Sequence, residues 1–192
     1  MRKVGVVGTG TMASGIVQVF AQAGYDVVFV GRGEDKLAGV VSFIDKGLSK
    51  LVEKGRLTED AKSDTLGRLT RSTEREALAD VDIVVEAIAE DLAIKTELYK
   101  DLDRICRPGA ILATTTSSMP ITKLGAVTSR PESVIGMHFF NPATIMKLVE
   151  VVTTEATSAD VNETVLALCG AVGKVAAGNH DRTAGRSRCR RA

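Results

Sequence analysis

The segment that decides the fold is Gly8-Thr9-Gly10-Thr11-Met12-Ala13, which directly follows a short β-branched run, Lys3–Val7. Apolar residues with helical spacing begin inside this segment and continue to Ala23, where Gly24 ends them. A strand, a glycine-rich turn and a helix in this order are typical of the first unit of a dinucleotide-binding domain. The sequence therefore predicts a nucleotide site near the start of the chain.

Each small residue of this segment has a physical role in such a site. Gly8 permits the tight turn, Gly10 lets the backbone approach a pyrophosphate, and Ala13 allows the helix to pack closely on the strand. The free N–H groups of the first helical turn, at Thr11 and Met12, then favour phosphate. The alternative is a plain glycine turn, which the flanking strand and helix make the less favoured interpretation.

Strand-like and helix-like segments alternate along the chain. The strand-like segments are Lys3–Val7, Asp26–Val30, Leu69–Arg71, Asp82–Ala87, Ala110–Thr114, Val134–Phe139 and Lys147–Val152. The helix-like segments are Thr11–Ala23, Glu34–Lys54, a short piece from Thr58, Leu92–Ile105, Ile121–Val127 and Ala159–Val172. Alternation predicts an α/β, Rossmann-type fold, with a mostly parallel sheet and helices on both faces. The last two strands are joined too closely for a helical crossover, so we expect an antiparallel strand addition near the C-terminus.

The composition suits one globular domain with an aliphatic core. The 192 residues are 44% hydrophobic, but only 4% are aromatic and none is Trp, as expected for a parallel sheet covered by helices. We assign residues 1–178 to the dinucleotide-binding domain. We assign residues 179–192 to an Arg-rich tail that we expect to be disordered.

Charge and cysteine usage exclude several classes of protein. Residues 182–192 hold five of the 25 basic residues, which leaves 20 basic against 24 acidic residues in the rest of the chain. That balance argues against nucleic-acid binding, and no apolar run is long enough for a signal peptide or a membrane span. Cys106, Cys169 and Cys189 lack metal-binding spacing, which indicates reduced thiols in a cytoplasmic protein without a metal site.

The position that usually selects the cofactor departs from the common pattern. A carboxylate is expected at the end of the second strand, where it binds the ribose 2′-hydroxyl of NAD. Gly31 stands there instead, and Arg32 follows it. The two residues indicate either a turn glycine beside a solvated arginine or a pocket for the 2′-phosphate of NADP, and the sequence leaves both interpretations open.

An acid–base pair is suggested by His138 and Glu150. His138 is one of only two histidines and ends an apolar run, while Glu150 is a lone carboxylate within the next predicted strand. An imidazole can take a proton, and a carboxylate on its far nitrogen would fix the tautomer and stabilise the imidazolium. The alternative for His138 is a core histidine bonded to a backbone carbonyl, and for Glu150 a solvated residue on an edge strand.

A run of hydroxyl side chains, Thr114–Ser118, follows another strand. The carboxyl ends of the strands are where an open α/β sheet binds its ligands. Ser117 could therefore bond a substrate oxygen, although a helix cap or turn role is the alternative for an isolated serine.

Together these segments resemble the L-3-hydroxyacyl-CoA dehydrogenase family over roughly residues 3–175. The matching pieces, in the order of the family, are Gly8–Ala13, Val84–Ile88 with Glu90 and Lys95, Thr116–Ser118, His138–Pro142 and Met146–Val151. The resemblance implies NAD-dependent oxidation of (S)-3-hydroxyacyl-CoA to 3-oxoacyl-CoA, in fatty-acid β-oxidation or 3-hydroxybutyryl-CoA metabolism.

The resemblance also implies roles for single residues. His138 would take the hydroxyl proton while Glu150 holds the imidazole. Ser117 and Asn141 would bond the reacting oxygen or the nicotinamide region.

Three further residues would contact the ligands. Glu90 and Lys95 would line the cofactor site, and Lys54 would contact CoA.

The end of the chain departs from the family. Family members continue with a helical domain that closes the substrate cleft and forms the dimer, whereas this chain turns to Arg-rich sequence after Asp181. We expect a frameshifted or truncated end that lacks most of the dimer surface. Two alternatives to the family activity follow: a catalytically weak or silent nucleotide-binding remnant, and a related dehydrogenase of a free hydroxy acid or sugar acid.

Overall fold

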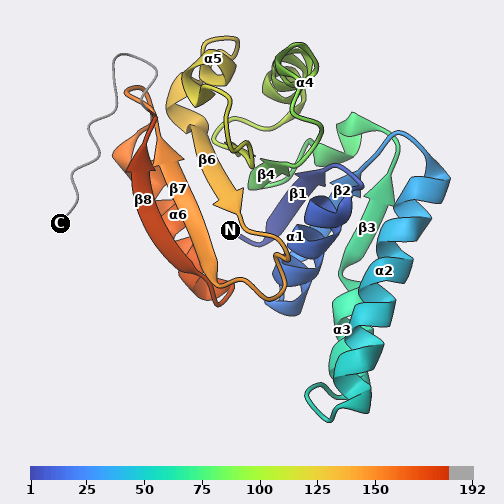
Figure 1. Ribbon diagram of the computed structural model, residues 1–192. Coiled ribbons are helices and arrows are strands. Elements are labelled where there is room, and N and C mark those ends of the chain that lie inside the picture. The colour runs from blue at the N-terminus through green and yellow to red at the C-terminus, as the bar shows by residue number, and fades with distance from the viewer. Residues whose placement is uncertain (182–192) are drawn as a thin grey trace.

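A computed structural model describes residues 1–181, which form one eight-stranded sheet with helices on both faces (Figure 1). The strands are β1 Lys3–Val7, β2 Asp26–Val30, β3 Leu69–Ser72, β4 Ile83–Glu86, β5 Ile111–Thr114, β6 Val134–Phe139, β7 Leu148–Thr153 and β8 Val175–His180. The helices are α1 Thr11–Gln22, α2 Glu34–Glu53, α3 Glu59–Gly67, α4 Leu92–Ile105, α5 Ile121–Gly125 and α6 Ala159–Ala171, with short 3₁₀ turns at Arg75–Leu78 and Pro131–Ser133.

The strand order is β3-β2-β1-β4-β5-β6-β7-β8. All neighbours pair in parallel except β6 and β7, which are antiparallel. The chain crosses from one half of the sheet to the other between β3 and β4, which places a topological switch point beside β1. The predicted Rossmann-type fold and its antiparallel addition are thus confirmed.

Two hydrophobic clusters cover the two faces of the sheet. Helices α1, α2 and α6 pack on one face through residues such as Ile16, Ile44 and Leu168. Helices α4 and α5 pack on the other through residues such as Leu102 and Leu124. Successive strand residues point to opposite faces, and both faces are covered, so β4 and β5 are buried throughout and β1 is buried after Lys3.

Strand β8 was not predicted, and it changes the domain boundary. It pairs with β7 over Val175–His180 and therefore runs past residue 178, the end of the predicted domain. The predicted disordered tail began at residue 179, but Asn179 and His180 belong to β8, so the prediction is wrong for these two residues. Residues 182–192 of the predicted tail lie outside the described part of the chain. No helix within residues 1–181 is long and apolar enough to cross a membrane.

Candidate functional site

A cavity of about 570 Å³ opens at the carboxyl ends of β1, β2 and β4. Seven of the residues predicted to bind a cofactor line it: Gly8, Thr9, Gly10, Thr11, Met12, Gly31 and Arg32. Ala13 lies directly beneath them and is completely buried. The other walls come from the segments after β3 and β4 and from α4, whose Ile94 and Leu98 add an apolar surface.

The backbone at the start of α1 fits a pyrophosphate. Gly8 has a φ of 136°, and a Cβ there would lie 2.4 Å from the carbonyl oxygen of Ala87, so only glycine suits the turn. A Cβ on Gly10 would meet no atom within 4 Å, so the protein leaves open space beside this backbone. The first helical bond runs from Ser14 N to Gly10 O, and the preceding N–H groups are left for a ligand. The donor set therefore fits the predicted nucleotide.

The two residues of the predicted acid–base pair meet across neighbouring strands. His138 on β6 and Glu150 on β7 stand opposite each other in the antiparallel register, with 2.7 Å between Nδ1 and Oε2. An ionised carboxylate can only accept, so it keeps the proton on Nδ1 and leaves Nε2 free to take another. The side chains are 24% and 32% exposed, which lets a ligand reach the imidazole. The ring of Phe140 packs against it with 4.8 Å between the centroids.

Glu90 and Ser117 are joined at the ends of β4 and β5. Glu90 Oε1 accepts a hydrogen bond of 3.0 Å from Ser117 N, and the Thr116 hydroxyl also donates to this carboxylate. Partial burial raises the pKa of Glu90, but these donors and the charge of Lys95 outweigh it and hold the pKa below its usual range. The result is a charged carboxylate that orders the loop carrying Ser117, with the serine side chain exposed to a ligand.

Lys95 lies behind Glu90 and is only 1% exposed. Its ammonium is 2.6 Å from Oε1 of the fully buried Glu86 and 3.5 Å from Oε2 of Glu90. Glu86 also accepts hydrogen bonds from Ile88 N and from the Thr114 hydroxyl, both at 2.8 Å. The Lys95 ammonium is thus paired with carboxylates inside the protein, and its contact with a cofactor stays a prediction. Sequence reasoning gave Glu86 no role, although a carboxylate in an otherwise apolar strand was a signal.

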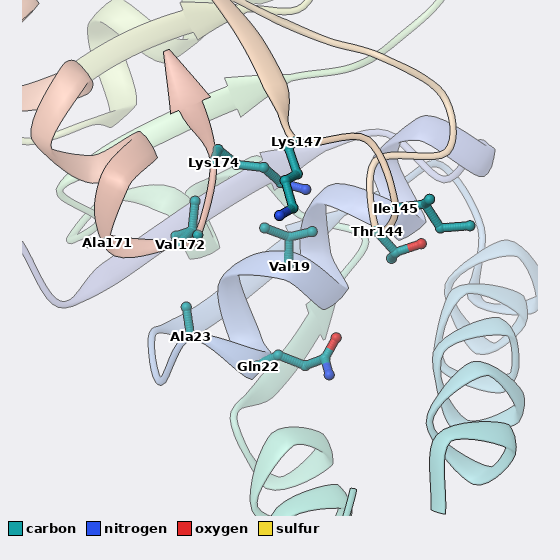
Figure 2. Close-up of a pocket in the computed structure, with 10 residues that line it drawn as sticks. Val19, Gln22, Ala23, Thr144, Ile145, Lys147, Ala171, Val172 and Lys174 are labelled. Atoms are coloured by element: carbon teal, nitrogen blue, oxygen red, sulfur yellow. The ribbon is translucent and has the colours of Figure 1, made fainter. Parts of the chain in front are cut away.

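The loop between β6 and β7 carries Asn141, which is exposed three residues beyond His138. Lys174 secures this loop, because its ammonium donates hydrogen bonds to the carbonyl groups of Ala143 and Met146. A pocket of about 380 Å³ lies beside this loop. In Figure 2, the side chains of Lys174 and Lys147 both extend over the end of α1. This pocket contains none of the predicted site residues.

Lys54 lies apart from the other predicted site residues. It is exposed and caps the C-terminal end of α2, whose first turn begins beside the cofactor cavity. A helix of 20 residues is about 30 Å long, so Lys54 lies far from the cavity. Its contact with CoA stays a prediction.

Comparisons with known proteins agree on one family. The model of the family "3-hydroxyacyl-CoA dehydrogenase, NAD binding domain" matches residues 3–181. A 3-hydroxybutyryl-CoA dehydrogenase of Clostridioides difficile is 44% identical over 90% of this chain and 62% of the relative. A 3-hydroxyadipyl-CoA dehydrogenase of Escherichia coli is 41% identical over 91% of this chain and 37% of the relative.

A solved structure gives the same result. The (S)-3-hydroxybutyryl-CoA dehydrogenase of Ralstonia eutropha superimposes with a TM-score of 0.92 at 40% identity, over 94% of this chain and 64% of the other. The chain spans about three-fifths of the length of several curated relatives, from 59% to 62% for three that are named 3-hydroxybutyryl-CoA dehydrogenase or probable 3-hydroxybutyryl-CoA dehydrogenase.

Proposed function

Because the chain belongs to the 3-hydroxyacyl-CoA dehydrogenase family, we propose that it serves the NAD-dependent oxidation of (S)-3-hydroxyacyl-CoA to 3-oxoacyl-CoA. The observation that carries the proposal is the contact of 2.7 Å between His138 and Glu150, which lies on the same edge of the sheet as the cofactor cavity. The substrate class rests on the names of the relatives, which include 3-hydroxybutyryl-CoA and 3-hydroxyadipyl-CoA dehydrogenases.

In this proposal the chain's own residues move the proton. His138 Nε2 takes the proton of the substrate hydroxyl, and Glu150 stabilises the imidazolium that forms. Ser117 and Asn141 hold the reacting oxygen or the nicotinamide amide by hydrogen bonds. When bound, NAD supplies the acceptor for the hydride that leaves the substrate carbon.

The finer parts of the proposal concern cofactor and setting. NADP is an alternative to NAD, because Gly31 and Arg32 stand where the ribose carboxylate is expected. Fatty-acid β-oxidation or 3-hydroxybutyryl-CoA metabolism in the cytoplasm is the setting that the predicted activity suggests.

Turnover of acetoacetyl-CoA, followed at 340 nm, tests the roles of the pair. We expect His138→Gln to lower kcat by about 10²-fold or more, because this assay follows the reduction, in which His138 gives back the proton that it takes in the oxidation. Glu150→Gln should also lower kcat, because the imidazole loses its charged partner. Cofactor affinity should change little in both variants, since neither residue lines the cofactor cavity.

His180 provides a matched control, because it is the other histidine and lies exposed on β8. His180→Gln should leave kcat unchanged. Near-normal kcat in both His138→Gln and Glu150→Gln would contradict the proposed pair. Turnover of a free 3-hydroxy acid without any response to the thioester would select the related dehydrogenase instead.

A further inference from the structure

Three polar side chains gather at one end of the cavity. Arg32 follows β2, while Thr73 and Arg75 follow β3, and all three line the cavity. The two strands are parallel neighbours, and their pairing continues to Gly31, whose N–H donates to the carbonyl of Ser72 at 3.2 Å. Sequence reasoning missed Thr73 and Arg75, because only the register of β2 on β3 brings them beside Arg32.

Basic side chains line this end of the cavity. The residues that line it include two arginines and no carboxylate, and the Thr73 hydroxyl donates a hydrogen bond of 3.3 Å to the carboxylate of the neighbouring Glu74. Arg75 is held in place by an ion pair with Asp101 of α4. Arg32 is exposed, and no ion pair to it is found within residues 1–181. The nearest acid after it, Glu34, is paired instead with Arg71, with 3.7 Å between Oε2 and Nε.

The same end is closed to the carboxylate that an NAD-specific site would place there. A Cβ at position 31 would lie 2.3 Å from Thr9 Cγ2 and 3.2 Å from Leu37 Cδ2. Any side chain at this position would have to displace Thr9. A ribose 2′-hydroxyl would therefore find no anionic acceptor, whereas a 2′-phosphate would meet guanidinium groups that suit its charge and shape.

We propose that Arg32 and Arg75, with the Thr73 hydroxyl, form a binding site for the 2′-phosphate of NADP(H), and that the chain prefers NADP(H) to NAD(H). This inference rests on the proposed dinucleotide-dependent function. The proposed 2′-phosphate site is separate from the site of the proton transfer, because β2 and β3 are separated from β6 and β7 by three other strands of the sheet.

Binding of nucleotides to the full chain tests the proposal without turnover. Titrations would use NADPH and NADH by fluorescence, and 2′,5′-ADP and 5′-AMP by calorimetry. We expect each 2′-phosphorylated ligand to bind about tenfold or more tightly than its partner, and the difference to shrink with added salt. Arg32→Ala and Arg75→Ala should each lower the affinity for NADPH by about tenfold and change the affinity for NADH by less than about threefold.

Two further variants sharpen the test. Arg71→Ala is the matched control, because Arg71 is an exposed arginine of β3 that does not line the cavity, and it should leave both affinities unchanged. Thr9→Ala combined with Gly31→Asp removes the obstructing methyl group and restores a carboxylate, so it should shift the preference toward NADH.

The outcomes separate this inference from the proposed function. Tight NADH binding with weak NADPH binding would overturn the 2′-phosphate site and leave the proposed function standing. Equal weakening of both cofactors by Arg32→Ala would also overturn it, because the arginine would then act on the shared pyrophosphate. Failure of both cofactors to bind would overturn the inference and the proposed function together.

Discussion

The contact between His138 and Glu150 depends on how two strands are aligned. The two residues are separated by twelve positions, yet the antiparallel pairing of β6 and β7 makes them direct partners. Cross-strand partners lie about 5 Å apart at Cβ, close enough for the side chains to meet. The sequence could predict which two residues form the pair, because both interrupt apolar runs. Their distance could not be predicted, because it depends on the register between the strands.

Other single residues escaped prediction because they act through distant partners. Glu86 gains its importance from Lys95 and Thr114, and Lys174 from carbonyl groups 28 and 31 positions earlier. Backbone carbonyls carry no residue-specific signal. A lysine that bonds to them therefore has the same sequence appearance as one that points into solvent.

Replacing Lys174 should loosen the loop that carries Asn141. Lys174→Met removes the donor to the carbonyl groups of Ala143 and Met146. We expect faster hydrogen exchange at the amides of Ile145 and Met146, which bond to Pro142 O, and a lower kcat with nearly unchanged cofactor affinity.

Lys147→Met is the control for that prediction. Lys147 lines the same pocket (Figure 2) and is exposed, and its ammonium makes no hydrogen bond or ion pair found within residues 1–181. Its replacement should leave the exchange of both amides unchanged. If the two variants behave alike, Lys174 does not secure the loop.

Helix α4 is attached to the sheet by more than apolar packing. Its Lys95 reaches the carboxylate of Glu86 at the end of β4, and the pair is almost completely buried. Removing one partner leaves the other charge buried without compensation. The end of β4, and with it the loop to Glu90, should therefore depend on this pair.

Lys95→Met should lower the free energy of unfolding by about 3–5 kcal/mol, and so should Glu86→Gln. The double variant should lose less than the sum, because no charge then remains uncompensated. Lys100→Met is the control on the same helix, since the pair of Lys100 with Glu97 is 53% and 71% exposed and should contribute no more than about 0.5 kcal/mol. Urea unfolding at pH 7 measures all four, and additive losses would contradict the coupling.

The elements with strong periodicity or clear breaks were predicted within a few residues. Helix α2 ends at a glycine with positive φ, and β1 and β2 are short β-branched runs. Strand β8 was missed because Val175–His180 is rich in small residues and mostly exposed, without the alternation of a half-buried strand. It is a strand because β7 offers it a backbone edge.

The two faces of the molecule each contain a buried thiol. Cys106 belongs to the cluster under α4 and Cys169 to the cluster under α6. Burial raises the pKa of each thiol from 9.0 to about 11. The unfolded chain releases these protons near pH 9 and the folded chain near pH 11, so the folded state holds more protons between the two values.

The free energy of unfolding should therefore fall as the pH rises from about 9 to about 11, by roughly 2 kcal/mol for each thiol. Urea unfolding under reducing conditions at pH 8 and pH 11 measures the loss. A Cys106→Ala/Cys169→Ala variant will start less stable at pH 8 because of lost packing, but its loss between the two pH values should be smaller. Equal losses in both proteins would contradict a role for the thiols.

At the scale of the whole molecule, the strand order determines how a ligand must extend. The site residues form a row along one edge of the sheet, in the order of the strands that carry them. The row begins with Arg32 after β2 and Gly8 after β1, continues with Glu90 after β4 and Ser117 after β5, and ends with His138 in β6. Neighbouring strands are about 4.8 Å apart, so the row spans about 19 Å. A dinucleotide anchored at one end acts as a tether that raises the local concentration of its reactive ring at the other, to the millimolar range for a short flexible link. Detached halves of the cofactor would lose that advantage, even if every contact in the row were kept.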